Sequence, residues 1–188
     1  MTVDSSAVAT WANLVTVARF LVAPLMFWLI PDEPGGSWVA FGLWFVLCVS
    51  DGIDGYLARR HGTTTLGAFL DPLADKVLVL GAMFTLVSRG TFWIVPVAIV
   101  AARELAISLY RTYVGAKGIS VPASKVAKWK TVVQQLSVGF AIAPLTVDDK
   151  WLWNGLLWLS VVLALVSGCQ YMWRAHRVKQ VARTTVAV

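Results

Sequence analysis

The longest uncharged stretch of the chain is residues 151–173, WLWNGLLWLSVVLALVSGCQYMW. A helix that crosses the hydrocarbon core of a bilayer needs about 20 mostly apolar residues. This stretch has 23 residues and therefore predicts a transmembrane helix. A second uncharged run of 17 residues, 131–147, lies between Lys130 and Asp148. Two long apolar runs joined by a short polar turn indicate a chain that crosses a membrane more than once.

The composition of the whole chain also indicates an integral membrane protein. The 188 residues are 58% hydrophobic and only 14% charged, whereas soluble domains are about 45–50% apolar and about 25% charged. The mean hydropathy is +0.71, and the ten tryptophans fit a membrane protein because Trp is enriched at bilayer interfaces. A disordered chain and a nucleic-acid-binding domain are disfavoured, in spite of the net charge of +6. Cys48 and Cys169 lie in apolar runs, so neither a disulfide framework nor a zinc site is expected.

The apolar runs and the turns between them predict an all-α integral membrane protein with six transmembrane helices. Polar turns at 31–37, 88–90 and 147–150 separate these helices in pairs. The expected helices lie near residues 11–30, 37–60, 66–88, 91–114, 124–147 and 150–173.

Basic residues are concentrated on one side of the expected bundle. Most of the 16 lie near residues 59–60, at 117–130 and after residue 173, whereas Arg89 and Lys150 lie in the opposite turns. By the positive-inside rule the basic side faces the cytosol, so both termini are expected there, in a multi-pass protein of the cell (inner or plasma) membrane. No basic n-region of a signal peptide is evident. We expect a single domain over residues 1–177 and a mobile basic cytoplasmic tail over residues 178–188.

Acidic residues gather at the cytoplasmic ends of the second and third expected helices. They are Asp51, Asp54, Asp71 and Asp75. Spacings of three and four residues place each pair on one helix face. Because the connection between the helices is short, they are antiparallel neighbours and the two acidic faces can meet. The small residues Gly55, Ala58 and Gly67 lie along these faces and permit close approach of a backbone or a ligand.

This grouping of carboxylates predicts a metal site for diphosphate chemistry at the cytoplasmic face. Four converging carboxylates repel one another unless cations lie between them. An all-oxygen site suits two Mg²⁺ or Mn²⁺ ions, which can hold the attacking and leaving oxygens of a phosphoryl displacement. Arg59 is placed to pair with a phosphate. A single intramembrane Asp is more often an ion relay or a helix cap, and it is the group of four that favours a metal site.

Two segments carry a recognisable signature. Residues 51–59, DGIDGYLAR, and residues 67–75, GAFLDPLAD, resemble the pattern of the CDP-alcohol phosphotransferases. That pattern is D-x-x-D-G-x-x-A-R, a variable gap, and then G-x-x-x-D-x-x-x-D, and all eight fixed positions match. The resemblance implies a six-helix membrane enzyme, usually a homodimer, that uses a CDP-linked lipid or alcohol and releases CMP.

The resemblance also implies a role for each matched residue. The four aspartates would hold two metal ions, and Asp75 would act as general base on the acceptor hydroxyl, which needs a base within hydrogen-bond reach. In the first helix, residues 13–19 resemble the family's N-x-x-T-x-x-R segment. The CDP pocket would be formed by Asn13, Thr16, Gly55, Ala58, Arg59, Gly67 and one of Thr64 and Thr65, with Thr65 as the candidate. A helix cap and a back-bonded threonine are alternative interpretations of Asn13 and Thr16.

Basic residues of the fourth and fifth expected helices are candidates for binding an acceptor that carries a phosphate. They are Arg103, Arg111, Lys128 and Lys130. Arginine and lysine are the side chains suited to an anionic phosphate. This region resembles the family members that join CDP-diacylglycerol to sn-glycerol 3-phosphate, the phosphatidylglycerophosphate synthases. That resemblance implies CDP-diacylglycerol, glycerol 3-phosphate and membrane lipids as partners, and no nucleic acid. Alternatively, part of the basic stretch 117–130 only contacts anionic lipid.

Other functions stay open at this stage. A cardiolipin synthase of the same fold would take phosphatidylglycerol as acceptor, and a phosphatidylinositol-phosphate synthase would take another alcohol. A membrane cation transporter would use the carboxylates for the transported ion, but its site would lie near mid-membrane with access from both sides. An intramembrane prenyltransferase also uses Asp-rich metal sites, although with different spacing and more spans.

Overall fold

The computed structural model contains six α-helices and no strand within the backbone that it describes, residues 5–32, 35–61, 65–116 and 124–186. Side chains are described for residues 16–32, 35–50, 52, 73–115, 124 and 126–177. The helices are α1 (Ser5–Leu29), α2 (Trp38–His61), α3 (Thr65–Ser88), α4 (Ile94–Ala116), α5 (Lys125–Ile142) and α6 (Lys150–Val186). The prediction of an all-α fold with six helices is confirmed.

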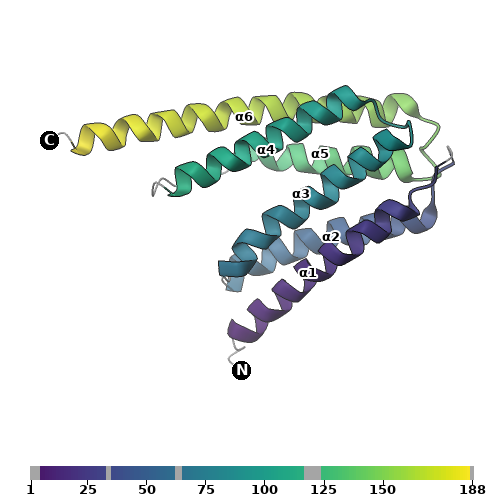
Figure 1. Ribbon diagram of the computed structural model, residues 1–188, viewed down its shortest axis with the longest axis horizontal. Coiled ribbons are helices and arrows are strands. Elements are labelled where there is room, and N and C mark those ends of the chain that lie inside the picture. Colours follow the sequence, from purple (N-terminus) through teal and green to yellow (C-terminus); the bar gives the residue numbers. More distant parts are fainter. Residues whose placement is uncertain (1–4, 33–34, 62–64, 117–123, 187–188) are drawn as a thin grey trace.

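The helices form two groups that spread apart toward one end of the molecule. α1 packs against α2 and α3, α6 packs against α4 and α5, and α3 joins the groups through its contacts with α4 and α5. Figure 1 shows the groups close together at the end with the α1–α2, α3–α4 and α5–α6 connections, and separated at the other end. The start of α1 and the end of α6 both lie toward the open end.

The closed end holds the apolar core. Met26, Met83 and Ile142 are almost completely buried there, on three different helices. Hydrogen bonds between distant segments add to this packing: the backbone N–H of Ser37 donates to the Ile142 carbonyl (3.0 Å), and the Ser137 hydroxyl donates to the Trp153 carbonyl (2.8 Å). The buried charged side chains of Arg19, Glu104 and Lys130 lie outside this apolar cluster.

The outer surface of the bundle is strongly apolar. Large hydrophobic side chains are exposed on all six helices, and Trp28, Leu145 and Trp151 are each at least 75% exposed. A soluble monomer rarely exposes apolar patches larger than a few hundred Å². A helical bundle with this surface is suited to lipid, because its backbone polar groups are satisfied within each helix.

By length and apolar composition, one of the described helices qualifies as a membrane span, over residues Lys150–Arg177. Shorter apolar segments, Thr16–Leu29 and Trp38–Ser50, lie in α1 and α2. The sequence predicted six spans. The difference has a physical cause in α3, α4 and α5, because each carries charged residues inside its apolar run, such as Lys76, Glu104 and Lys130.

Three predicted helix boundaries were wrong. α1 begins at Ser5 and not near residue 11. α5 ends at Ile142 and not at residue 147, because Pro144 lacks a backbone N–H and the preceding Ala143 is extended (φ −68°, ψ 128°). α6 does not end at residue 173 but continues to Val186, through most of the predicted tail. No glycine or proline follows Gly168 in this helix, and Ala175 packs against Val114 of α4. The boundary at residue 177 therefore marks no change of secondary structure.

The contact between α1 and α3 is tight enough to test. A Cβ atom on Gly81 would lie 2.6 Å from Cε2 of the Phe27 ring and closer still to its Cζ. We expect Gly81→Ala to lower the free energy of unfolding by about 1–3 kcal/mol, because the ring must move out of a packed interface. The measurement is the thermal unfolding midpoint of the protein in detergent. Gly42→Ala is the matched control, since a Cβ there meets nothing within 4 Å. Equal midpoints for the two variants would contradict the close packing.

Candidate functional site

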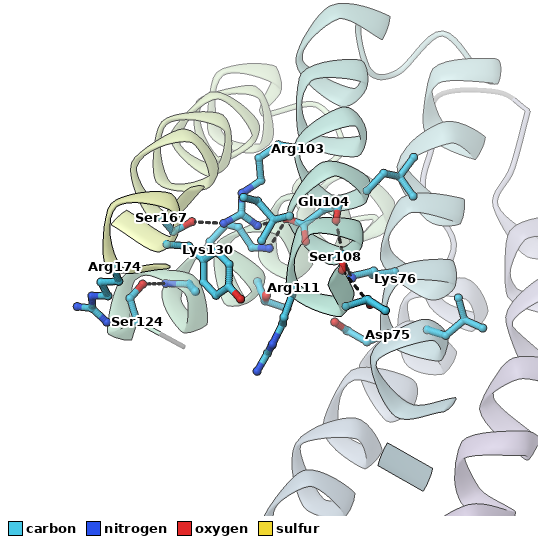
Figure 2. Close-up of a pocket in the computed structure, with 17 residues that line it drawn as sticks. Asp75, Lys76, Arg103, Glu104, Ser108, Arg111, Ser124, Lys130, Ser167 and Arg174 are labelled. Carbon is cyan, nitrogen blue, oxygen red and sulfur yellow. Dashed lines mark hydrogen bonds and ion pairs between the residues drawn. The ribbon is translucent and has the colours of Figure 1, made fainter. Parts of the chain in front are cut away.

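A polar cavity of about 650 Å³ lies between α3, α4, α5 and α6. Figure 2 shows side chains from these four helices converging on it. Five basic and two acidic side chains are among the residues that line it. The charged and polar lining residues are Asp75, Lys76, Arg103, Glu104, Ser108, Arg111, Thr112, Ser124, Lys130, Thr131, Ser167, Tyr171 and Arg174. Because the lining is predominantly cationic, the cavity is suited to an anionic ligand.

Asp75, the predicted general base, lies at the α3 wall of this cavity and is partly buried. Its neighbour Lys76 donates a hydrogen bond to the hydroxyl of Ser108 on α4. That hydroxyl in turn donates to the backbone oxygen of Glu104 (2.7 Å). The wall that carries the predicted base is thus connected to α4 through a short polar chain.

The centre of the cavity wall is a buried ion network, the Glu104 cluster, formed by Arg103, Glu104, Lys130 and Ser167. Oε1 of Glu104 accepts hydrogen bonds from Nη1 of Arg103 (3.0 Å) and from Nζ of Lys130. Arg103 also donates from Nε to the Ala164 carbonyl (2.8 Å) and from Nη2 to the Ser167 hydroxyl (2.7 Å). This cluster joins α4, α5 and α6, and it satisfies each of its charges with an oppositely charged or polar partner.

Two further cations at the cavity have no such partners. Within the described part of the chain, neither Arg111 on α4 nor Arg174 on α6 makes an ion pair or a side-chain hydrogen bond. Figure 2 shows the Arg111 side chain extending away from the Glu104 cluster. These two guanidinium groups retain their full donor capacity for a ligand.

The start of α5 determines which of its lysines faces the cavity. Ser124 is the N-cap, and its side chain accepts a hydrogen bond from the backbone N–H of Ala127 (3.2 Å). With the helix beginning there, Lys130 is buried and lines the cavity, whereas Lys128 is exposed and is not among the lining residues. The structure therefore brings together three of the four predicted acceptor-binding residues, Arg103, Arg111 and Lys130, and places Lys128 apart from them.

Most of the other predicted site residues lie outside the described side chains. These residues are Asn13, Asp51, Asp54, Gly55, Ala58, Arg59, Thr65, Gly67 and Asp71. The alternative residue Thr64 lies outside the described backbone as well. Thr16 is described and is buried on α1. Among the described residues there is no group of three or more Asp, Glu, His or Cys that could hold a metal ion. The predicted aspartate quartet is not tested by that finding, because only Asp75 of the four was searched.

The backbone nevertheless bears on the predicted metal site. α2 is helical through residues 51 and 54, and α3 is helical through residues 71 and 75. Spacings of three and four residues on a continuous helix place each pair of aspartates on one face. This is the backbone geometry that the spacing argument requires.

Two of the five cavity cations, Lys76 and Arg174, were not predicted as ligand-binding residues. Lys76 carried a signal in the sequence, because a lysine within an apolar helix needs a partner or a function. Arg174 follows the uncharged stretch directly and was interpreted only as part of the positive cytoplasmic side. Its place at the cavity depends on how α6 packs against α4, which the sequence pattern does not reveal.

Comparison with known proteins identifies the class. Residues 9–166 match the family model of the CDP-alcohol phosphatidyltransferases. The chain is 32% identical over 176 residues to a probable phosphatidylglycerophosphate synthase of Mycobacterium tuberculosis, an alignment that covers 90% of this chain and 83% of the relative. It is 34% identical over 169 residues to a CDP-diacylglycerol–glycerol-3-phosphate 3-phosphatidyltransferase of Pseudomonas fluorescens, covering 85% and 87% of the two chains. A protein of the same name from Haemophilus influenzae is 33% identical over 173 residues, covering 84% and 89%.

The chain belongs to the CDP-alcohol phosphatidyltransferase family. It is therefore a transferase, and its apolar outer surface is that of a membrane protein. The resemblance that the sequence motifs indicated, to this family and to its phosphatidylglycerophosphate synthases, is confirmed.

Proposed function

We propose that this enzyme transfers the phosphatidyl group of CDP-diacylglycerol to sn-glycerol 3-phosphate and releases CMP and phosphatidylglycerophosphate. A hydroxyl oxygen of the acceptor forms a bond to the phosphatidyl phosphorus, the bond from that phosphorus to the oxygen of CMP breaks, and the hydroxyl proton passes to a base. The observation that carries this proposal is the cationic cavity beside Asp75, because an acceptor that bears a phosphate needs such a site. The relatives named for this activity support it.

The acceptor phosphate is bound by the cations that are not neutralised within the protein. Within the described part of the chain, the guanidinium groups of Arg111 and Arg174 are available, and the Ser108 hydroxyl is the only hydrogen-bond partner of Lys76. Hydrogen bonds between such groups and a phosphate are charge-assisted and roughly twice as strong as neutral ones. Binding the phosphate here places the rest of the acceptor in the same cavity as Asp75.

The donor diphosphate is held on the other side of Asp75, where α2 ends and α3 begins. Asp51, Asp54, Asp71 and Asp75 form an all-oxygen donor set that fits two Mg²⁺ or Mn²⁺ ions, and the helical backbone at all four positions supports this fit. When bound, such ions neutralise the diphosphate and stabilise the charge on departing CMP. The small residues Gly55, Ala58 and Gly67 leave room for the nucleotide. The CDP pocket is completed by Arg59, Asn13, Thr16 and Thr65.

Asp75 accepts the proton of the acceptor hydroxyl in this proposal. It belongs to both halves of the site, because it is the last aspartate of the quartet and also lines the acceptor cavity. A carboxylate within hydrogen-bond reach of a hydroxyl can act as general base. The cavity sits toward the open end of the bundle, where the start of α1 and the end of α6 also lie, and we assign that end to the cytosol of the cell membrane.

The first test determines which acceptor the enzyme uses. Purified protein in detergent with Mg²⁺, CDP-diacylglycerol and radiolabelled glycerol 3-phosphate should release CMP and form a labelled phosphorylated lipid. CMP release that requires phosphatidylglycerol in place of glycerol 3-phosphate would contradict the proposed acceptor and establish the cardiolipin synthase alternative. Cation flux into vesicles without CMP formation would instead establish a transporter.

The second test is the general base. We expect Asp75→Asn to fold and to bind CDP-diacylglycerol, but to lower the turnover number by at least about 100-fold, because the amide cannot accept the proton. The measurement is CMP release at saturating substrates, with thermal unfolding as the check on folding. Asp149→Asn, in the exposed turn at the closed end, is the control. Normal turnover of the Asp75 variant would remove the assignment.

The third test is the phosphate site. Arg111→Ala should raise KM for glycerol 3-phosphate by about tenfold or more, because a charge-assisted contact to the phosphate is lost. KM for CDP-diacylglycerol should change by less than about threefold. Arg177→Ala is the matched control, since Arg177 is also an exposed arginine near this end but stacks over the Trp173 ring, 3.8 Å from its centroid. Similar KM values for the wild type and the Arg111 variant would exclude Arg111 as a phosphate ligand.

A further inference from the structure

The five cations of the cavity fall into two sets. Arg103 and Lys130 are bound to the buried carboxylate of Glu104, which is 7% exposed. In the described part of the chain, Lys76, Arg111 and Arg174 form no ion pair with a carboxylate. Whether a cation is available to a ligand therefore depends on its distance from one acidic side chain, Glu104.

The two cations bound to Glu104 are held to different degrees. Arg103 is fixed independently by its hydrogen bonds to the Ala164 carbonyl and the Ser167 hydroxyl of α6. Among the residues whose side chains the structure describes, Glu104 is the only side-chain partner of Lys130. Its ammonium group is carried on a flexible four-carbon stem, so without the Glu104 charge it is free to turn into the cavity that it already lines.

We propose that Glu104 is a positioning residue that sets the charge of the acceptor cavity. By holding Lys130 against α4, Glu104 leaves three cations facing the ligand, which is enough to offset the two negative charges of one phosphate monoester. The cavity thereby binds such an acceptor without retaining anions too tightly for turnover. This inference rests on the proposed function for the identity of the acceptor, but the control of anion affinity by Glu104 can be measured without it.

The opposite assignment is that Lys130 itself binds the acceptor phosphate and Glu104 only completes the packing. The two assignments differ in what happens when both charges of the pair are removed. If Glu104 and Lys130 neutralise each other, replacing both conserves the net charge of the cavity and leaves the phosphate affinity nearly as it was. If Lys130 is a phosphate ligand, the double replacement loses that ligand.

The test uses the isosteric variants Glu104→Gln and Lys130→Gln, and the two combined. The probe is inorganic phosphate, and its Kd is measured by thermal shift and by calorimetry on the full chain in detergent, with EDTA present so that divalent ions do not contribute. We expect Glu104→Gln to lower the phosphate Kd by about tenfold and Lys130→Gln to raise it by about tenfold, because each changes the charge of a poorly solvated cavity by one unit. The double variant should lie within about threefold of the wild type.

A double variant that binds phosphate as weakly as Lys130→Gln would overturn the proposal and make Lys130 a direct ligand. Unchanged Kd values in all three variants, with lower unfolding midpoints, would also overturn it and leave the Glu104 cluster a purely structural feature. If Glu104→Gln alone does not fold, comparing the phosphate Kd of Lys130→Gln with that of the double variant still distinguishes the two assignments of Lys130.

Asp32→Asn is the matched control, because it removes a carboxylate from the ion pair with Arg89 at the closed end of the bundle. Its phosphate Kd should equal that of the wild type. Failure of the proposed function is distinguishable from failure of this inference. An enzyme that makes no lipid from glycerol 3-phosphate but shows the expected order of phosphate Kd values would refute the acceptor assignment and support the role of Glu104.

Discussion

The ion network around Glu104 is the interaction on which the open half of this bundle depends. Charged side chains are costly in an apolar surrounding unless each has a partner. Here one carboxylate accepts from an arginine of its own helix and from a lysine of α5, and the arginine continues to two oxygens of α6. Three helices are thereby joined by polar contacts at this level of the bundle. The same side chains form part of the cavity wall.

The same network separates the cations of the cavity into those bound to Glu104 and those available to a ligand. Without a carboxylate among them, five basic side chains lining one cavity would repel one another and would bind any anion. Because Glu104 binds two of them, Arg103 and Lys130, the remaining cations face a ligand from three helices, α3, α4 and α6. The α3 wall also carries Asp75, so a bound phosphate and a carboxylate base share one enclosed space. The closed apolar end of the bundle gives this site a rigid foundation.

Much of the fold followed from local patterns. Apolar run lengths, polar turns and the distribution of basic residues predicted six helices, and the six helices lie close to the predicted ranges. The errors were at helix ends, where Pro144 shortens α5 and the contact of Ala175 with Val114 accompanies the long extension of α6. The expectation of six apolar spans was weakest for α3, α4 and α5, because their interior charges serve the cavity and lower the apolar content of each helix. The aspartate quartet remains a prediction from the signature, supported by helical backbone at its four positions.

By itself, the sequence determined the class of the protein, the number of helices, the family and the position of Asp75 one turn after Asp71. These properties depend on composition and on spacing along a single helix, so neighbouring residues suffice to reveal them. Only the tertiary structure decided which basic residues share the cavity and which are neutralised. Lys128 and Lys130 are equivalent in the sequence but face differently, and Arg174 joins the site from a helix that begins 24 residues earlier. Such assignments depend on contacts between helices that are far apart along the chain, and no local pattern encodes them.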